Sequence, residues 1–578
     1  MQSSSPSFTG ALWAPLVAAP ELIARGAARG LSPTAARLLA LRFPDRVDEG
    51  AAEPVIEHLH DPTTMLHMDA AVDRLRRSVR DRERIRVVTD YDVDGTTSSL
   101  ILQAALKIAA GTSEGANITY HIPHRFVEGY GFSVAAAEAA AKDGVSLIVT
   151  ADIGVRDHAA VAKAREYGID VLVCDHHLPH GAQVPQDAIV LCPPQDGDSY
   201  ANPSLAACGI SLKVAQALLA THPKRDEVVR SLLKLAAIGT VADLVPLTTR
   251  ENRAIVALGL RELNTGRHSV GLTALLQAAG LGKEPIREND LGYRVGPRIN
   301  AAGRVADAKL VVELLTCKDA ARATELAGEI ERLNSQRRDL QGKLSEDALR
   351  RAATMNDPFV LIEGREEDGY HRGVVGIVAS RVKDEVHRPV AIVSIQGDRA
   401  VGSIRSVPGV HAVQALDSAR DLLEKYGGHP VAAGFTVPTQ HLEALRQRLC
   451  DFVRNAVGGD APVHVREVDA FLDVSDVGDG LLAELERLGP FGMGNPRPRL
   501  VVRRVEPRNL EVRADKGLVK FAIPRLGGGW IEAVWWDHTD LGGRLAGGPI
   551  DLLGDLQEHR WNGTRRLQFQ LHDARASG

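Results

Sequence analysis

The stretch Ile85-Arg-Val-Val-Thr-Asp90-Tyr-Asp92-Val-Asp94-Gly95 joins an apolar segment of strand length to three alternating aspartates. From here to Cys192, short apolar segments alternate with alanine-rich amphipathic ones. Because alternating strands and helices build a parallel sheet with helices on both faces, we expect a doubly wound α/β domain. The expected strands are Ile85–Thr89, Ile118–Ile122, Leu147–Thr150, Val171–Cys174 and Ile189–Cys192, and the expected helices are Ser98–Ala109, Ser133–Ala141 and His158–Tyr167.

Beyond this domain the pattern changes twice. Helical character dominates from Ser211 to about Thr354 and ends in a long charged segment, Ala321–Arg351. A second, smaller α/β unit follows, and after the Pro/Gly-rich stretch Gly489–Pro498 short strands separated by glycines predict a β-barrel. We therefore predict an N-terminal extension (1–50), a catalytic core with a helical part (51–320), a connecting helix (321–352), a second α/β domain (353–458) and a barrel domain (459–578).

Composition narrows the class of protein. The chain has 578 residues, which predicts several domains, and its 44% hydrophobic and 25% charged content is ordinary for a globular protein. No apolar run approaches the roughly 20 residues that span a bilayer, and no signal peptide is expected. Five scattered cysteines without a Cys-x-x-Cys pair indicate a cytoplasmic location and no structural zinc. The formal charge of −5 does not exclude nucleic acid, because arginines cluster locally.

The alternating aspartates and the following glycine are also typical of the start of an EF-hand calcium loop. That loop requires a bidentate glutamate at its twelfth position, which here is Ile101. It also requires a helix before it, where this sequence has an apolar strand. We therefore reject an EF-hand.

Further acidic and imidazole groups follow other predicted strands. Asp152 follows the third strand, and Asp175-His176-His177 follows the fourth. Because the carboxyl ends of parallel strands meet at one edge of a sheet, we expect these groups to gather there. Two carboxylates about 4 Å apart repel each other by roughly 4 kcal/mol at an effective dielectric constant near 20, so such a cluster must take up protons or cations. Carboxylates with an imidazole suit Mn²⁺ or Mg²⁺ better than Zn²⁺.

Four motifs carry a resemblance to a known superfamily. They are Asp92-x-Asp94, Asp152, Asp175-His176-His177 and Gly239-Thr-Val-Ala-Asp243-Leu-Val-Pro-Leu. In this order they resemble the four motifs of the DHH phosphoesterase superfamily. The resemblance implies two divalent ions, Mn²⁺ or Mg²⁺, that share one bridging carboxylate.

The resemblance also implies a role for each ligand. Asp152 bridges the ions, Asp92 holds one of them, and Asp94, His176 and Asp243 hold the other. His177 faces a substrate phosphate. Pyrophosphatase-like members carry a metal-binding histidine where this chain has Val88, so we expect Asp90 to take its place, either directly or through water.

Six longer stretches narrow the branch of the superfamily, which includes pyrophosphatases, oligoribonucleases and cyclic-dinucleotide phosphodiesterases. They are His121–Gly131, Gly296–Arg304, Arg372–Arg381, Gly402–Ser406, Gly427–Gly434 and Gly489–Pro496. These stretches are similar to segments of the RecJ family of single-strand-specific 5′→3′ exonucleases, including its accessory DHHA1 domain and its junction into an OB-fold. The similarity covers nearly the whole chain apart from about the first 45 residues and the last few.

Arginines in these stretches indicate a path for phosphates, because a guanidinium group pairs with phosphate oxygens in two parallel hydrogen bonds. Gly428 permits close backbone approach to an anion, and His429 adds a donor that can become cationic. The resemblance implies that Arg125, Ser403 and Arg405 receive the 5′ end, with His429 near the scissile phosphate. The expected substrate contacts are Arg125, Arg298, Asn300, Arg304, Ser403, Arg405, Gly428 and Trp561, and the expected catalytic groups are His177 and His429.

The predicted barrel carries four of the five tryptophans, Trp530, Trp535, Trp536 and Trp561. An OB-fold binds single strands by stacking bases on aromatic rings, at about 1–3 kcal/mol per base, in a basic groove. We expect two or more of these tryptophans to serve the barrel core. Trp561, which follows Arg560, is the residue we expect to stack on a base.

These observations predict a monomeric two-metal exonuclease that releases 5′-mononucleotides from single-stranded DNA. We expect it to act in DNA repair and recombination, with a helicase and a single-strand-binding protein as partners and without a membrane. Two other classes stay open. One is a related enzyme for short oligoribonucleotides or nucleotide phosphates, which would need no OB-fold. The other is a catalytically inactive scaffold, a class that typically loses metal ligands which this chain retains.

Overall fold

The computed structural model describes residues 6–49, 53–111, 117–179, 183–459, 463–525, 529–561 and 564–578. The chain divides into two compact units. The first comprises Met1–Gly303, Asp307–Ile330 and Arg466–Gly578, and the second comprises Arg304–Ala306 and Glu331–Val465. No helix within the described ranges is long and apolar enough to cross a membrane.

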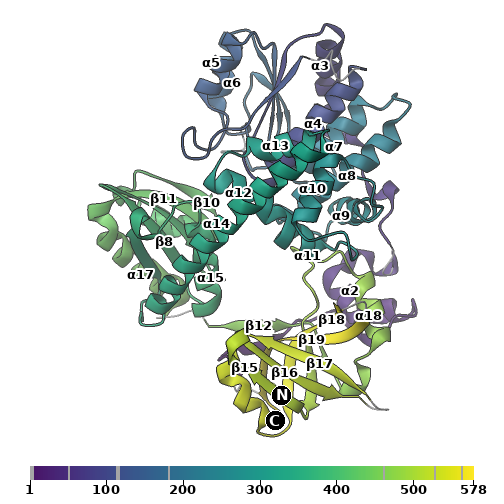
Figure 1. The fold of residues 1–578 in the computed structure, drawn as a ribbon, viewed down its shortest axis with the longest axis vertical. Helices are drawn as coiled ribbons and strands as arrows, with labels where there is room; N and C mark the ends of the chain where they lie inside the picture. The colour runs from purple at the N-terminus through teal and green to yellow at the C-terminus, as the bar shows by residue number, and fades with distance from the viewer. Residues whose placement is uncertain are drawn as a thin grey trace. The chain divides into compact units, whose positions relative to one another are not determined.

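A five-stranded parallel sheet lies at the centre of the region predicted as the catalytic core, in the order β3-β2-β4-β5-β6. Neighbouring residues of β4 enter different cores: Val149 packs with residues of α3, α4 and α7, whereas Ile148 packs with residues of α5 and α6. Figure 1 shows these two groups of helices on opposite faces, which confirms the doubly wound fold. The elements are α3 (Met68–Arg80), β2 (Ile85–Thr89), α4 (Val93–Ala109), β3 (Ile118–His121), α5 (Val134–Lys142), β4 (Leu147–Ala151), α6 (His158–Glu166), β5 (Asp170–Cys174), β6 (Ala188–Leu191) and α7 (Ala207–Leu218).

The strand order reverses at β2. From β2 the chain crosses to β3 on one side and then returns to β4 on the other. Open α/β sheets bind ligands at such a reversal, outside the carboxyl ends of the strands. Asp90 follows β2 and Asp152 follows β4, so the acidic residues fall at this point.

Helices dominate the rest of the catalytic region, as the sequence predicted. A π-helical turn at Leu291–Val295 precedes α12, and such turns occur frequently at functional sites. The long helix α14 confirms the predicted connecting helix. The helices are α8 (Arg225–Ala242), α9 (Arg250–Leu263), α10 (Val270–Ala278), α12 (Gly296–Val305), α13 (Lys309–Thr316) and α14 (Ala320–Ala352).

The second unit has its own five-stranded sheet, ordered β10-β11-β9-β8-β7. β7 and β8 are parallel, and the other pairs are antiparallel. Residues of α17 pack into the core on one face, and residues of α14 and α15 into a second core. The elements are β7 (Val360–Arg365), α15 (Val375–Val386), β8 (Val390–Gln396), β9 (Arg399–Arg405), β10 (Lys425–His429), β11 (Ala432–Pro438) and α17 (Leu442–Val457).

The C-terminal part of the first unit is a seven-stranded sheet, ordered β13-β14-β18-β19-β17-β16-β15. β14 and β15 lie far apart in this order, yet only Glu506 and Pro507 connect them. The sheet must therefore curl round to bring these strands together, as in an OB-type barrel. The strands are β13 (Ala470–Leu472), β14 (Leu500–Val505), β15 (Arg508–Arg513), β16 (Leu518–Pro524), β17 (Trp530–Trp536), β18 (Ile550–Trp561) and β19 (Thr564–Ala576).

Residues of the predicted N-terminal extension pack into this barrel domain. β1 (Leu12–Pro15) pairs with β12 (Val465–Val468). Leu38 of α2 (Pro33–Arg42) shares a hydrophobic core with Leu500 of β14. Residues of the extension are therefore part of the barrel core.

Helix α7 carries a buried ion pair. Lys213 on α7 lies 2.6 Å from Glu251 on α9, and both side chains are fully buried. Glu251 also accepts hydrogen bonds from the Tyr200 hydroxyl and the His60 backbone N–H, and Lys213 donates to the His60 carbonyl. Hydrogen bonds thus satisfy both charged groups, and the ion pair joins α7 to α9.

Replacing Lys213 by Met is expected to lower the free energy of unfolding by about 3–5 kcal/mol, because Glu251 is left as a buried charge without its counter-ion. The double substitution Lys213→Met, Glu251→Gln should cost less than the sum of the two single substitutions. Chemical denaturation followed by circular dichroism measures both effects. A loss below about 1 kcal/mol in the Lys213→Met variant would contradict this account.

Candidate metal centre

The first three aspartates occupy the turn between β2 and α4. Asp90 is buried, and Asp92 caps α4 by accepting a hydrogen bond from the Gly95 N–H at 3.0 Å. Asp94 lies in the first turn of α4 and is also buried. A side chain at Gly95 would collide with the Asp90 backbone, so the turn that gathers these acids requires glycine there.

Asp152 and His176 follow the neighbouring strands. Asp152 has a left-handed backbone conformation with φ 63°, which aspartate tolerates better than most residues. His176 follows β5, and its Nε2 lies 3.2 Å from Asp152 Oδ1. Its Nδ1 lies 3.6 Å from Oδ2 of Asp243, the residue directly after α8. Strand ends and a helix end therefore supply the site together.

The structure brings the six predicted metal-binding residues together. Their ligand atoms form overlapping groups in which the atoms lie within 4.8 Å of one another. Asp152 and His176 each belong to two of these groups, so Asp152 links the acids after β2 to His176. The groups are Asp90, Asp92 and Asp152; Asp94, His176 and Asp243; and Asp152, His176 and His177.

Burial and mutual repulsion make this cluster unfavourable without cations. Burial, followed by repulsion from Asp92, raises the pKa of Asp90 and of Asp152 well above the usual range. Burial and repulsion from Asp94 raise the pKa of Asp243 in the same way. Asp90 Oδ1 and Asp243 Oδ2 are buried and have no hydrogen-bond partner among the described residues. Carboxylate oxygens left in this state, beside an imidazole, fit Mn²⁺ or Mg²⁺.

Helix α7 orients Asp94. The two Asp94 carboxylate oxygens accept hydrogen bonds from the backbone N–H groups of Ala207, at 2.7 Å, and Cys208, at 2.9 Å. The first N–H groups of a helix have no partner within it and favour a negative charge. Each oxygen keeps a further lone pair for a metal ion. Nothing in the sequence Ala207-Cys208 marks an anion-binding turn, so this contribution was not predicted.

Asp175 positions His177, a role that was not predicted from the sequence. Asp175 Oδ1 lies 2.7 Å from His177 Nδ1, and the carboxylate also accepts hydrogen bonds from the backbone N–H groups of Val155 and His176. Burial alone would lower the pKa of His177, but the Asp175 contact outweighs it and raises this pKa. His177 Nε2 lies 3.3 Å from the Tyr130 hydroxyl. Tyr130 belongs to a stretch matched to the family, but it was not among the predicted site residues.

The remaining predicted arginines fall in both units. Arg125, Arg298 and Asn300 are partly exposed in the first unit. The Arg125 guanidinium lies 5.0 Å from the centroid of the Tyr91 ring, which places it beside the acidic turn. Arg298 lies on α12, just after the π-helical turn. Arg304 belongs to the second unit, where its Nη1 donates to a backbone carbonyl at 3.0 Å.

The other predicted phosphate contacts share one region of the second unit's sheet. Arg405 Nη1 donates to Ser403 Oγ on the same strand at 2.8 Å. Arg405 and His429 both lie opposite Ala432 in the strand register, so their side chains leave the same face of the sheet. Gly428 has φ 150°, and a side chain there would collide with the Ala432 backbone.

The barrel tryptophans differ in exposure. Trp535 is 1% exposed and belongs to the barrel core, whereas Trp530 and Trp536 are 70% and 48% exposed. Side chains alternate between the two faces of a strand, so the outward positions of β17 carry Trp530 and Trp536. Among the described side chains Trp535 is thus structural, and the expectation of two or more structural tryptophans is not tested without Trp561. The side chain of Trp561, the predicted stacking residue, lies outside the described residues.

Three family models match the chain. They are the "DHH family, N-terminal domain" over residues 84–240, the "DHHA1 domain" over 357–455 and the "RecJ OB domain" over 468–573. The single-stranded-DNA-specific exonuclease RecJ of Bacillus subtilis is 35% identical over 524 residues, which cover 90% of this chain and 64% of that protein. RecJ of Escherichia coli is 34% identical over 537 residues, which cover 87% of this chain and 89% of that protein.

Solved structures of RecJ also match the chain. The crystal structure of Thermus thermophilus RecJ with Mn²⁺ superposes with a TM-score of 0.81 at 29% identity, covering 98% of this chain and 80% of that one. The corresponding structure with Mg²⁺ gives a TM-score of 0.75 at 28% identity, covering 98% and 78%. The chain belongs to the RecJ family of single-stranded-DNA-specific exonucleases.

Proposed function

We propose that this chain hydrolyses single-stranded DNA from its 5′ end and releases 5′-mononucleotides, with two divalent metal ions as cofactors. The cluster of aspartates with His176 at the reversal of strand order carries this proposal. Its unpartnered carboxylate oxygens fit cations. The relatives, named as single-stranded-DNA-specific exonucleases, supply the substrate class.

Divalent ions in this centre would lower the pKa of a shared water and neutralise charge on the scissile phosphate. We assign Asp152 as the bridging residue, because its carboxylate groups with Asp90 and Asp92 on one side and lies 3.2 Å from His176 on the other. Asp90 and Asp92 complete the site on one side. Asp94, His176 and Asp243 form the other site, with Asp94 held by the start of α7.

His177 is assigned to the substrate phosphate rather than to an ion. Asp175 engages its Nδ1, which orients the ring and leaves Nε2, on the side of Tyr130, as the donor. The raised pKa of His177 favours the cationic form that pairs with a phosphate. His177 would thereby stabilise charge that grows on the phosphoryl oxygens.

In the second unit we assign Ser403 and Arg405 to the 5′ end and His429 to the scissile phosphate. The support is their common face on the sheet and the Arg405 guanidinium, which is oriented by Ser403 Oγ. A guanidinium group binds phosphate oxygens through two parallel hydrogen bonds. The further strand contacts that we assign are Arg125, Arg298, Asn300, Arg304, Gly428 and Trp561.

We also propose a cellular setting for this activity. The enzyme acts as a cytoplasmic monomer in DNA repair and recombination, with a helicase and a single-strand-binding protein as partners. The five cysteines form no disulfide, which fits a reducing compartment.

Digestion of single strands labelled at the 5′ or the 3′ end, with Mn²⁺ present, tests the activity. A 5′-labelled strand should release labelled mononucleotide at once, whereas a 3′-labelled strand should shorten progressively. A blunt duplex of the same sequence should stay intact, and long strands should be cut faster than dinucleotides. Immediate release of the 3′ label, or a preference for dinucleotides, would refute the assignment.

Replacing Asp152 by Ala should lower turnover about 1000-fold or more, because loss of the shared carboxylate removes several kcal/mol of charge stabilisation. Single-strand binding should stay nearly unchanged. The matched control is Asp226→Ala on α8, where the side chain is 84% exposed, and it should cleave at the wild-type rate. Normal turnover in the Asp152→Ala protein would exclude the proposed centre.

Titration with Mn²⁺, followed by the electron paramagnetic resonance signal of the free ion, counts bound ions without any cleavage. The wild-type chain should bind two ions. Asp90→Ala should keep one and weaken the other about 10-fold or more, since Asp90 supports the ion next to Asp92. The Asp226→Ala control should bind two ions as the wild type does. Equal Mn²⁺ binding by the wild-type and Asp90→Ala proteins would show that Asp90 does not support an ion.

A further inference from the structure

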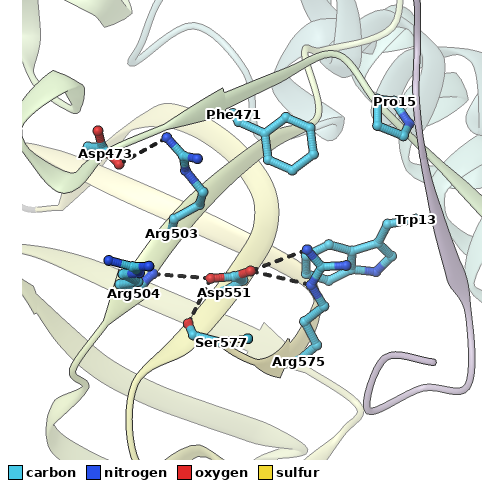
Figure 2. Close-up of a pocket in the computed structure, with 10 residues that line it drawn as sticks. Trp13, Pro15, Phe471, Asp473, Arg503, Arg504, Asp551, Arg575 and Ser577 are labelled. Carbon is cyan, nitrogen blue, oxygen red and sulfur yellow. Dashed lines mark hydrogen bonds and ion pairs between the residues drawn. The ribbon is translucent and has the colours of Figure 1, made fainter. Parts of the chain in front are cut away.

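A cavity of about 740 Å³ lies in the barrel domain. It does not involve β17, the strand that carries the exposed Trp530 and Trp536. Its walls come from β1, β13, β14, β18 and β19 (Figure 2). In the sheet, β18 and β19 separate β14 from β17. Trp13 and Arg575 line the cavity but lie outside residues 468–573, which match the OB model. The size is that of a small-molecule site.

Trp13 and Arg575 form a fixed wall of this cavity. The Trp13 indole N–H donates to the fully buried Asp573 at 3.0 Å. The Arg575 guanidinium lies 4.5 Å from the centroid of the Trp13 ring, and both its Nε and Nη2 lie 3.3 Å from Asp551 Oδ2. Because these side chains hold one another, little ordering entropy is lost when a ligand binds against them.

Among the side chains that line the cavity, three arginines face two aspartates. Asp551 offsets Arg575, and Asp473 pairs with Arg503 at 3.2 Å in an exposed contact of the kind that contributes little. Among the described residues no acidic side chain forms an ion pair with Arg504. The backbone of Arg504 has φ 53° at an irregularity between β14 and β18, which turns its side chain out of the regular strand pattern. Arg504 is thus a guanidinium group available to an anion.

Flat apolar surface accompanies this charge. Phe471 on β13 is 38% exposed, and Trp13 is half-buried. Figure 2 shows Arg503 and Arg504 on one side of the cavity and Trp13 with Arg575 on the other. A phosphate beside a flat ring is the chemistry of a nucleotide. The carboxylate of Asp473 would accept hydrogen bonds from base amino groups but would repel an acidic peptide.

We propose that this cavity binds one nucleotide of single-stranded DNA, with its base against Phe471 and its phosphate on Arg504. The site is a strand contact of the barrel outside the metal centre and outside β17. It rests on the DNA substrate of the proposed function but not on the assignment of the metal ligands.

Fluorescence anisotropy of the full-length protein with labelled oligonucleotides, in the presence of a chelator to prevent cleavage, tests this site. Arg504→Gln should weaken binding of a 20-nucleotide oligothymidylate about fivefold and lower the slope of log K against log salt by about 0.7, as for one lost phosphate contact. Phe471→Leu should weaken the same complex about fivefold but leave an abasic strand of equal length unaffected, because only stacking is lost. The control Arg508→Gln removes an exposed arginine of β15 outside the cavity and should bind as the wild type does.

Equal affinities of all four proteins for the oligonucleotide would overturn the proposal. A second contrary result concerns thymidine monophosphate. If it raises the melting temperature of the wild-type protein but not of the two cavity variants, and if these variants bind DNA as the wild type does, the cavity serves a free nucleotide. The proposal would also be overturned if the Arg504→Gln variant lost binding to an acidic peptide but kept its affinity for DNA. Failure of the wild-type protein to bind or digest the strand would instead refute the proposed function.

Discussion

Repulsion between buried carboxylates is the constraint around which the catalytic region is organised. Five aspartates meet at one edge of the parallel sheet, and each pair about 4 Å apart costs roughly 4 kcal/mol at an effective dielectric constant near 20. The pKa of Asp90, Asp152 and Asp243 is raised accordingly. The burial that makes the cluster costly also strengthens its attraction for a cation, because a low local dielectric increases both effects.

The backbone prevents the carboxylates from moving apart to relieve this repulsion. Asp92 is fixed as the cap of α4, and Asp152 is held in a left-handed conformation. Asp94 is held by the N–H groups that begin α7. The buried Lys213–Glu251 pair joins α7 to α9, so part of the stability of the fold serves the geometry of the centre.

The sequence predicted the parallel sheet and the gathering of the acids because buried parallel strands are short apolar runs that end at a polar residue. β2 was predicted to the residue, and the aspartates after β2 and β4 then had to share one edge. β18 extends to Trp561, well beyond its apolar start Ile550–Leu553, because a barrel strand alternates polar and apolar residues and the apolar pattern ends early. The Asp94 contact with α7 and the core that Leu38 shares with Leu500 depend on residues more than 100 positions apart, which no local pattern records.

The formal charge of −5 is a poor guide to DNA affinity because it sums charges over the whole chain, whereas five carboxylates gather at the metal centre. The five carboxylates of the centre carry up to five negative charges, and two divalent ions would supply four positive ones. Without ions the centre would repel a phosphate, and with ions it would be nearly neutral and able to accept one. Arginines elsewhere, such as Arg405 and Arg504, keep their charge in both states. On the proposed assignments, metal ions would control the entry of the scissile phosphate and the arginines would retain the strand, so binding and cleavage could be lost separately.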